Sequence, residues 1–405
     1  MVTIAVFISP IEDRMRKFHP TVKALKESGV DHVLDLQDRD CYNCVHSVQH
    51  LMKKSYPGGG CSVEAVVPLS ETAVEFSDIV AAMLGNSCHN PLHLTTSRRD
   101  KGFMKEAVHQ GGKNRVTAFA RLGRVEDVRE TIHKLNLTYP VVIKTPQGFS
   151  TSGVYICQNI IDAETATRTI LNKAGPDGRN VESALLEEFI EGTEFAVNLM
   201  ACKGKLVVTD VWKYVKTESA RYSQADICDP LDPSLKHIVE YSQRVAEAVG
   251  LDYGAGHVEV KAMQDFKTGL YINPCMVEIG ARLSGGRKAT MTEAALDGTW
   301  DPFAALIDSH SGVTPALPPS FSPKNFVRHI FLPIEKSGHV SDISLDTSKL
   351  TTLHSHFLLV EKGDFVNETT DITSCAGFVW LVGSKDEVEI DTAIVRSSFH
   401  IVLTS

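Results

Sequence analysis

Short apolar runs alternate with helical patterns along the first 95 residues of the chain. The runs 2–8 and 30–36 predict strands, and the segment 14–28 between them predicts a helix that Gly29 ends. This strand–helix–strand order predicts a Rossmann-like α/β domain over 1–95. Dinucleotide binding is not predicted, because no Gly-x-Gly-x-x-Gly follows the first strand. The stretch Pro57-Gly58-Gly59-Gly60 predicts a surface loop.

Two lobes are predicted between 96 and 310. The smaller lobe, about 96–180, has a helical pattern at 100–110, closed by Gly111 and Gly112, and strands at 116–120 and 139–144 with a helix between them. The larger lobe, about 181–310, has a helix at 232–249, ended by Gly250. Its apolar and β-branched runs predict strands at 182–190, 194–201, 205–215, 257–263 and 269–278.

A proline-rich segment marks the clearest boundary. Residues 314–323 contain four prolines, which cannot continue a helix or a central strand. Beyond it, 326–333, 356–360 and 378–382 are strand-like, and 386–402 predicts a closing helix, although its valines and isoleucines also permit a strand. We therefore expect a small, β-rich C-terminal α+β domain over 324–405, packed on the lobes before it.

The composition limits the class of function. The 405 residues, 43% of them hydrophobic, can bury a large core in two or three domains. The net charge is −9 without a basic block, so nucleic acid is not an expected partner. No apolar run approaches the ~20 residues that span a bilayer, and the start is typical of a strand rather than a signal peptide. Nine cysteines without a framework spacing predict reduced thiols in a cytoplasmic protein.

Two predicted strands in the larger lobe carry acids. Glu259 lies in Gly-His-Val-Glu-Val-Lys, and Glu278 lies in Val-Glu-Ile-Gly-Ala-Arg, which ends with Arg282. Carboxylates on adjacent strands can share divalent cations, and magnesium prefers oxygen ligands beside phosphates. Arginine can hold a phosphate or carboxylate with two parallel hydrogen bonds. The alternative is two ordinary strand acids, one of them paired with Arg282.

A lysine ends the strand 139–144 and opens onto a small, polar loop. Lys144 is followed by Thr-Pro-Gln-Gly-Phe-Ser-Thr-Ser-Gly, which includes Ser152 and Gly153. Backbone N–H groups of such a loop can receive phosphate, and lysine adds a positive charge. A simple hairpin has the same pattern.

A third segment combines a buried-strand pattern with adjacent acids. In Leu-Leu-Glu-Glu-Phe-Ile, alternation sends Glu187 and Glu188 to opposite faces, so one should point inward. A buried acid needs a partner, and an adenine amino group or ribose hydroxyls would serve. The alternative is an edge strand with two solvated acids.

In this order, the segments resemble the ATP-grasp superfamily, and in particular its carboxylate–amine ligases, which include the L-amino-acid (dipeptide) ligases. The resemblance covers about 95–300 well and the flanks loosely. It implies a two-lobed ATP-grasp core over 96–310, with ATP bound between the lobes.

The resemblance also implies roles for individual residues. Lys101 and Lys144 match lysines that contact the ATP phosphates, together with the loop at Ser152 and Gly153. Glu187 matches an acid at the adenine edge, and Glu194 matches the acid that binds the ribose. The backbone of Phe189 and Ile190 matches the hinge. Glu259 and Glu278 match magnesium ligands, and Arg282 matches the arginine that steadies the phosphoryl group or the acyl phosphate. An ordinary exposed helix lysine is the alternative for Lys101.

The sequence departs from the family at Gly280, where many members have an asparagine two residues after the second metal acid. The resemblance therefore implies ATP with one or two Mg²⁺ ions, which Mn²⁺ can replace. The implied partners are a small-molecule acid and amine, with no nucleic acid and no membrane; the family is also compatible with a homodimer.

Three weaker patterns carry alternatives. Cys41, Cys44, His46 and His50 could bind zinc, but an amphipathic helix is favoured because no second Cys-x-x-Cys exists. His257 shares a strand face with Glu259 and could orient a ligand, or it is a hydrogen-bonded core histidine. The stretch Trp212-Lys213-Tyr214 faces either substrate or core.

The favoured function is an ATP-dependent, ADP-forming carboxylate–amine ligase that acts through an acyl phosphate. A carboxylate is a poor electrophile, and transfer of the γ-phosphoryl group activates it for attack by an amine. Two alternatives remain at this point: a carboxylase-type ATP-grasp enzyme and a nucleotide-binding regulatory protein. The carboxylase would need a biotin carrier or a second active site, and retention of Lys144, Glu259, Glu278 and Arg282 argues against the regulatory protein.

Overall fold

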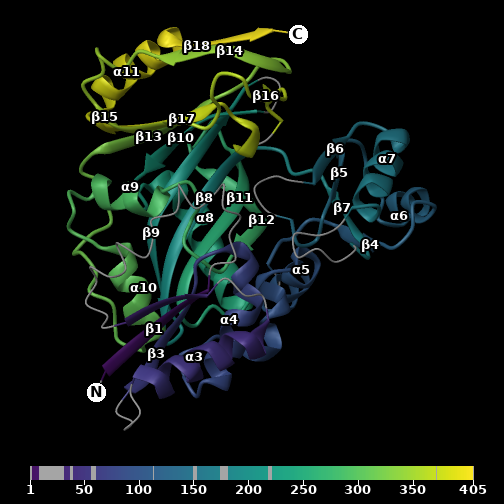
Figure 1. Cartoon of the computed structure of the whole chain (residues 1–405). Helices are drawn as coiled ribbons and strands as arrows, with labels where there is room; N and C mark the ends of the chain where they lie inside the picture. Colours follow the sequence, from purple (N-terminus) through teal and green to yellow (C-terminus); the bar gives the residue numbers. More distant parts are fainter. Residues whose placement is uncertain are drawn as a thin grey trace.

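The structure is a computed structural model of the chain, and Figure 1 shows its arrangement. It describes residues 2–8, 32–36, 40–55, 61–112, 114–148, 153–173, 181–217, 221–370 and 372–404. The predicted helix 14–28, the loop 57–60 and Ser152 lie outside these ranges. None of the helices in the described ranges is long and apolar enough to cross a membrane.

The N-terminal part contains a three-stranded parallel sheet. Strand β1 (Val2–Ile8) lies between β2 (His32–Leu36) and β3 (Cys61–Pro68) and pairs in parallel with both. Helices α3 (Cys41–Ser55) and α4 (Val74–Met83) pack together through an apolar cluster that also includes Val66 of β3. A parallel sheet with packed helices is the Rossmann-like pattern expected for this part of the chain.

The smaller lobe is built on a four-stranded antiparallel sheet that projects to one side of the molecule (Figure 1). Its order is β4-β7-β5-β6. Helices α6 (Asp127–Lys134) and α7 (Ile160–Leu171) bury their apolar faces in the same cluster as the sheet. The four strands are β4 (Phe119–Leu122), β5 (Val141–Lys144), β6 (Val154–Cys157) and β7 (Ala184–Glu188).

The predicted strand 182–190 belongs to this smaller lobe and not to the larger one. It forms β7, which pairs with β4 on one side and β5 on the other. The lobe boundary therefore falls after Glu188 rather than near 180. Apolar alternation shows that a strand is half-buried, but it does not show which sheet supplies the hydrogen-bond partners.

The larger lobe is dominated by an eight-stranded sheet with the order β12-β11-β8-β9-β10-β13-β17-β15. Its central strands are long and buried. Helix α8 (Lys236–Ala248), preceded by a short 3-10 turn (Pro233–Leu235), packs on one face. The first five strands are β8 (Thr193–Cys202), β9 (Lys205–Lys216), β10 (Tyr222–Cys228), β11 (Gly254–Gln264) and β12 (Tyr271–Gly280).

Helices α9 (Lys288–Ala295) and α10 (Pro302–His310) cover the other face of the sheet. Helix α10 shares an apolar cluster with Ala65 and Val67 of β3, so the N-terminal sheet packs against the larger lobe. Strand β10 was not predicted, because it is short and carries three polar side chains, Ser223, Gln224 and Asp226, among its seven residues.

The C-terminal part, expected as a small β-rich α+β domain, contributes strands to two different sheets. Strands β13 (Phe326–Leu332), β17 (Gly377–Gly383) and β15 (Leu353–Leu358) continue the eight-stranded sheet from β10. The four prolines interrupt the chain but not the sheet. A second, three-stranded sheet contains β14 (Gly338–Leu345), β16 (Phe365–Val366) and β18 (Phe399–Thr404).

The predicted closing helix 386–402 is divided between two elements. Helix α11 (Lys385–Ser398) begins with a capping box between Ser384 and Glu387. The β-branched end of the segment leaves the helix and forms β18. The helix interpretation is therefore correct for the segment up to Ser398, and the strand interpretation is correct from Phe399 onward.

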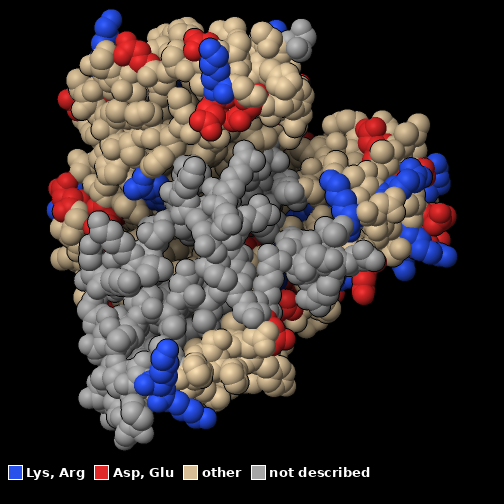
Figure 2. All heavy atoms as spheres, in the orientation of Figure 1, with Lys and Arg blue, Asp and Glu red and all other residues tan. Residues whose placement is uncertain are grey.

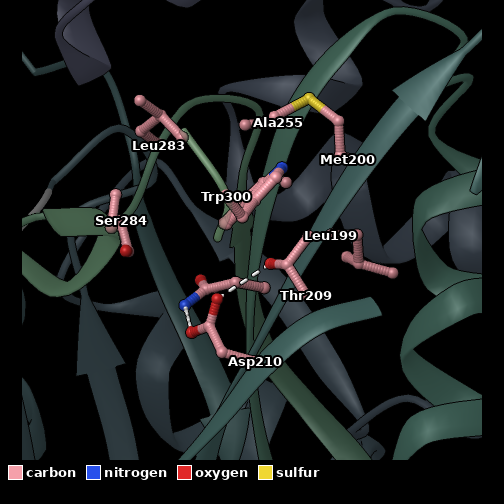
Figure 3. A pocket seen from close by; sticks show the side chains of 11 residues that line it. Leu199, Met200, Thr209, Asp210, Ala255, Leu283, Ser284 and Trp300 are labelled. Atoms are coloured by element: carbon pink, nitrogen blue, oxygen red, sulfur yellow. Dashed lines mark hydrogen bonds between the residues drawn. The ribbon is translucent and has the colours of Figure 1, made fainter. Parts of the chain in front are cut away.

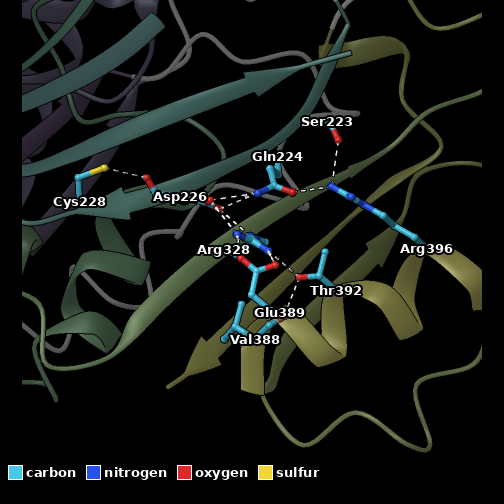
Figure 4. Close-up of polar contacts among 9 residues, drawn as sticks. All are labelled: Ser223, Gln224, Asp226, Cys228, Arg328, Val388, Glu389, Thr392 and Arg396. Atoms are coloured by element: carbon cyan, nitrogen blue, oxygen red, sulfur yellow. Dashed lines mark hydrogen bonds and ion pairs between the residues drawn. The ribbon is translucent and has the colours of Figure 1, made fainter. Parts of the chain in front are cut away.

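Arg328 fastens α11 to the large sheet (Figure 4). From β13, its guanidinium makes paired hydrogen bonds to Asp226 of β10, at 2.7 and 2.8 Å. It makes a second pair to Glu389 of α11, also at 2.7 and 2.8 Å, and a further bond to Thr392. All five N–H donors are thereby satisfied, although the side chain is buried.

On the face drawn in Figure 2, basic and acidic side chains are interspersed over the smaller lobe. This mixed surface agrees with the charge pattern of the sequence, which contains no basic block.

Candidate active site

The two predicted metal acids lie side by side on neighbouring strands. Glu259 of β11 and Glu278 of β12 are direct partners in the antiparallel register. Their side chains are 22% and 25% exposed, so both carboxylates reach an open space. Within the described ranges, no group of three or more His, Cys, Asp or Glu side chains is suited to hold a metal. Two carboxylates still fit magnesium, which keeps water and substrate phosphate among its ligands.

Lys101 lies beside these acids at the first turn of α5 (Lys101–Gln110). Asp100 caps the helix by accepting hydrogen bonds from the backbone N–H groups of Gly102 and Phe103. Lys101 is buried, and its Nζ lies 2.8 Å from Oε2 of Glu278. The alternative of an ordinary exposed helix lysine is therefore wrong. Burial opposes ionisation of Glu278, but Lys101 outweighs it and holds the pKa of Glu278 at about 2.

Lys144 ends β5 and has a carboxylate partner that the sequence did not indicate. Its Nζ lies 2.9 Å from Oε1 of Glu187 and 3.4 Å from the carbonyl oxygen of Val277. Lys105 of α5 approaches the other oxygen of Glu187, at 3.2 Å. Glu187 is thus the inward acid of the pair, and it is shared by two buried lysines. Burial raises the pKa of Glu187, but both lysines lower it, and the net direction is down.

The predicted hinge follows directly after β7. Phe189 lies under Lys261, whose Nζ is 4.9 Å from the ring centroid and 3.0 Å from the carbonyl oxygen of Ile190. The predicted ribose acid, Glu194, is the second residue of β8 and lies two residues after Gly192. Its carboxylate accepts from Lys216 at 2.8 Å and from the hydroxyl of Tyr222 at 2.6 Å. The hinge and Glu194 therefore lie at the junction of the two lobes.

The small polar loop after Lys144 joins two antiparallel strands, β5 and β6. Gly153 has a positive φ of 72°, and a Cβ there would lie 2.4 Å from Oγ1 of Thr145. Only glycine fits this close approach. The hairpin interpretation of the segment is correct as a description of its structure, and it is compatible with the phosphate-binding role.

Arg282 pairs with an acid from the N-terminal part, which sequence reasoning missed. Its Nε lies 2.6 Å from Oε2 of Glu71, in the 3-10 turn η1 (Glu71–Ala73). Arg99 approaches the other oxygen of Glu71, at 3.9 Å. Glu71 lies in the turn that follows β3, and its sequence resembles an ordinary helix start, so no local signal identified it.

The carboxylate of Glu71 also lies close to Gly280. A Cβ at Gly280 would lie 3.0 Å from Oε2 of Glu71 and 3.5 Å from Cζ of Arg282. Many family members have an asparagine at this position, but here its Cβ would crowd the carboxylate of Glu71, which would have to shift. The departure from the family pattern therefore coincides with a carboxylate that enters from another domain.

His257 connects Glu259 to a buried series of hydrogen-bonded polar side chains, Asn198 and Asp210. Its Nε2 lies 3.4 Å from Oε1 of Glu259, and its Nδ1 lies 2.7 Å from Oδ1 of Asn198. The amide of Asn198 donates to Asp210. His257 is thus a hydrogen-bonded core histidine that also contacts Glu259, the predicted metal ligand, so both interpretations of His257 agree with its position.

Asp210, the last residue of this hydrogen-bonded series, accepts several hydrogen bonds (Figure 3). The hydroxyl of Thr209 donates to it at 2.8 Å, and Nε1 of Trp212 donates at 2.6 Å. Trp212 is fully buried, so it belongs to the core rather than to a substrate surface. The adjoining cavity, which Asn198, Asp210, Ser284 and Trp300 help to line, has a volume of about 10 Å³. It has room for about one water molecule and not for a substrate.

The zinc alternative has no support in the described residues, because Cys41, Cys44, His46 and His50 lie on helix α3 and no metal-binding cluster is found there. Cys44 packs in the apolar cluster of the N-terminal part. The amphipathic-helix interpretation of this segment is therefore correct.

The two-lobed core, the acid pair and the lysines at the lobe junction are the features that the resemblance to the ATP-grasp superfamily implied. Residues 137–290 match the family model of the ATP-grasp domain. This match confirms the resemblance expected from the sequence.

Two curated relatives are similar over most of their lengths. The chain is 25% identical over 337 residues to the dapdiamide A synthase of Enterobacter agglomerans, which covers 78% of this chain and 74% of the relative. It is 22% identical over 299 residues to an L-arginine-specific L-amino acid ligase of Bacillus subtilis, which covers 71% and 68%.

Solved structures share the whole fold. The crystal structure of an L-amino acid ligase from Bacillus licheniformis matches with a TM-score of 0.76 and 18% identity, covering 100% of this chain and 99% of that one. A biotin carboxylase from Campylobacter jejuni matches with a TM-score of 0.64 and 13% identity, covering 98% and 92%. At these identities the likeness establishes the fold only.

Proposed function

We propose that the protein is an ATP-dependent, ADP-forming ligase that joins a carboxylic or amino acid to an amine through an acyl phosphate. The observation that carries this proposal is the direct pairing of Glu259 with Glu278, beside Lys101 and Arg282. The two relatives are named a dapdiamide A synthase and an L-arginine-specific L-amino acid ligase, and these names agree with the proposal.

Each residue of the candidate site has a distinct role in phosphoryl transfer. Lys101 and Lys144 contact the phosphates of ATP, and Glu194 with the backbone of Phe189 and Ile190 holds the nucleoside. Glu187 orients Lys144 and Lys105 at the adenine side of the site. Mg²⁺ held by Glu259 and Glu278 would supply charge neutralisation at the phosphates.

Arg282 stabilises the phosphoryl group during transfer and the acyl phosphate afterwards. Its planar guanidinium can hold two oxygens at once, which a lysine cannot do. The amine then attacks the acyl carbon, the amide forms, and phosphate leaves. Because these hydrogen-bond donors are positioned before the reaction, they stabilise the negative charge that develops on the phosphoryl group in the transition state.

In the present arrangement, the opposite charges of the site are paired with one another. Lys101 pairs with Glu278, Lys144 with Glu187, Lys216 with Glu194, and Arg282 with Glu71. Binding of ATP and Mg²⁺ therefore has to exchange the Lys101–Glu278 pair for contacts to phosphate and metal.

The proposal is tested by activation of the acid. The wild-type protein, incubated with ATP, Mg²⁺ and a panel of amino acids and small acids, should release ADP, and hydroxylamine should trap the acyl phosphate as a hydroxamate. Glu278→Gln should lower this rate by on the order of 10²-fold or more, while Glu240→Gln on the surface of α8 should leave it unchanged.

Two results would contradict the proposal. Hydroxamate that forms as fast with Glu278→Gln as with the wild type would remove Glu278 from the metal site. ADP release that requires bicarbonate, with no hydroxamate from any acid, would favour the carboxylase alternative.

A further inference from the structure

Lys288 is a buried cation that lacks the kind of partner that the other cations of the site have. It is the first residue of α9, and it is 5% exposed. Among the buried lysines and arginines of the described ranges, every other side chain makes an ion pair with an acid, and the ammonium of Lys288 alone makes neither an ion pair nor a hydrogen bond. An ammonium buried without a partner is costly unless something else neutralises it.

Lys288 nevertheless lies near the reaction centre. Its Nζ is 5.3 Å from the ring centroid of Tyr214, on β9. Glu259, Asp210 and Arg282 are the charged groups that act on it, and none of them is within ion-pair distance. Burial lowers the pKa of Lys288 to about 8, and the two carboxylates oppose this effect. Lys288 therefore lies within the electrostatic range of Glu259 without forming an ion pair with it.

His329 is a second unsatisfied group at the same place. It is buried on β13, stacked on Trp380 at 3.8 Å, and neither of its ring nitrogens has a hydrogen-bond partner. Gly286 links the two side chains: a Cβ there would lie 3.6 Å from Cε1 of His329 and 3.9 Å from Nζ of Lys288. One small group can therefore contact both.

We infer that Lys288, assisted by His329, binds the carboxylate of the amine substrate, which is then an amino acid rather than a simple amine. This inference rests on the proposed function. In the proposed function, Lys101, Lys144 and Arg282 bind the phosphates of ATP. The unpaired ammonium of Lys288 can therefore bind a different anion. The carboxylate of the acid substrate becomes the acyl phosphate at Arg282, which leaves the carboxylate of the attacking molecule for Lys288.

The geometry gives each group a distinct part. The ammonium of Lys288 donates to one carboxylate oxygen, and an N–H of neutral His329 donates to the other. Burial and the neighbouring Lys288 both lower the pKa of His329, which keeps the ring neutral. Gly286 has a positive φ of 66° and no side chain, so at this position the loop places only backbone atoms beside the two donors. Held in this way, the amino group can point toward the acyl phosphate.

The test compares acceptors with and without a carboxylate. For Lys288→Met, the KM for amino acid acceptors should rise about 10- to 100-fold, the range expected for a lost hydrogen bond to a charged group. Hydroxylamine has no carboxylate, so hydroxamate formation and the KM for ATP should change less than ~2-fold over the same comparison. Lys324→Met, on the surface, is the matched control. In the wild type, the carboxamide of an accepted amino acid should bind more weakly by a similar factor, and this measurement remains informative if the variant does not fold.

Three outcomes would overturn the inference. An equal loss with hydroxylamine and with amino acids would place Lys288 in the activation step. An unchanged acceptor KM would make it structural. Equal use of an amino acid and its carboxamide by the wild type would show that no carboxylate is recognised. Absence of any hydroxamate with the wild type would instead reject the proposed ligase itself.

Discussion

At the scale of single residues, the two lysines that share Glu187 should behave differently. Lys105 is fully buried inside the protein, whereas Lys144 ends β5 at the lobe junction and contacts β12 through Val277. One carboxylate therefore joins a structural lysine to a nucleotide-facing lysine. Burial lowers the pKa of Lys105, and Glu187 only partly offsets this effect.

We predict that Lys105→Met destabilises the protein by about 3–5 kcal/mol, because it leaves Glu187 buried with one partner fewer. Lys144→Met should cost less stability and should raise the KM for ATP and lower kcat. Chemical denaturation and steady-state kinetics on both variants separate these effects. The assignment would be wrong if Lys144→Met lost only stability and kept its affinity for ATP.

At the scale of elements, the N-terminal part contributes directly to the site. The turn η1 follows β3 and carries Glu71 to within 2.6 Å of Arg282, which lies beyond β12. Arg282 also donates to the carbonyl oxygen of Leu283, at 2.8 Å. The arginine is thus held from two sides before any substrate binds, which is the kind of preorganisation that lowers the cost of binding in the transition state.

We predict that Glu71→Gln lowers kcat about 10-fold and changes the KM for ATP by less than ~2-fold, because it releases an arginine that acts during transfer rather than in ground-state binding. Glu75→Gln, one turn later on α4, is the control. A matched loss of ATP affinity would instead place Arg282 in the nucleotide pocket. Gly280→Asn should reproduce the effect of Glu71→Gln, since its side chain would displace the same carboxylate.

At the scale of the whole molecule, one continuous sheet links the larger lobe to the C-terminal part. A buried histidine, His310, packs against this sheet. His310 ends α10 and lies against Gly254 at the start of β11, where a Cβ would be 2.5 Å from Nε2 of His310. Burial lowers the pKa of His310 to about 4 from the usual 6.5. The neutral ring is therefore the form that the folded protein accepts.

Stability should consequently fall as the solution becomes more acidic. A histidine whose pKa is lowered by folding contributes stability above pH 6.5, and this contribution is lost as the pH falls from 6.5 toward 4. The loss for His310 should be on the order of 1–3 kcal/mol. His310→Gln should flatten the decline between pH 7 and pH 5, measured by denaturation at each pH. An identical slope in the variant and the wild type would contradict this prediction.

The sequence by itself determined the elements that local patterns encode. The helix at 100–110 forms α5 as Lys101–Gln110, and the acid strands form β11 and β12. The ordered set of Lys144, Glu187, Glu259, Glu278 and Arg282 predicted a resemblance to the ATP-grasp superfamily, and strand alternation predicted that one acid of the Glu187–Glu188 pair points inward. These signals act within a few residues, so they can be read from the chain directly.

Tertiary structure alone decided which distant segments meet. It assigned β7 to the smaller lobe, extended the large sheet through β13, β17 and β15, and brought Glu71 to Arg282. It also gave Lys144 a carboxylate partner and left Lys288 without one. Hydrogen-bond partners between strands and ion pairs between domains depend on how the chain packs in space, and no periodicity in the sequence encodes them.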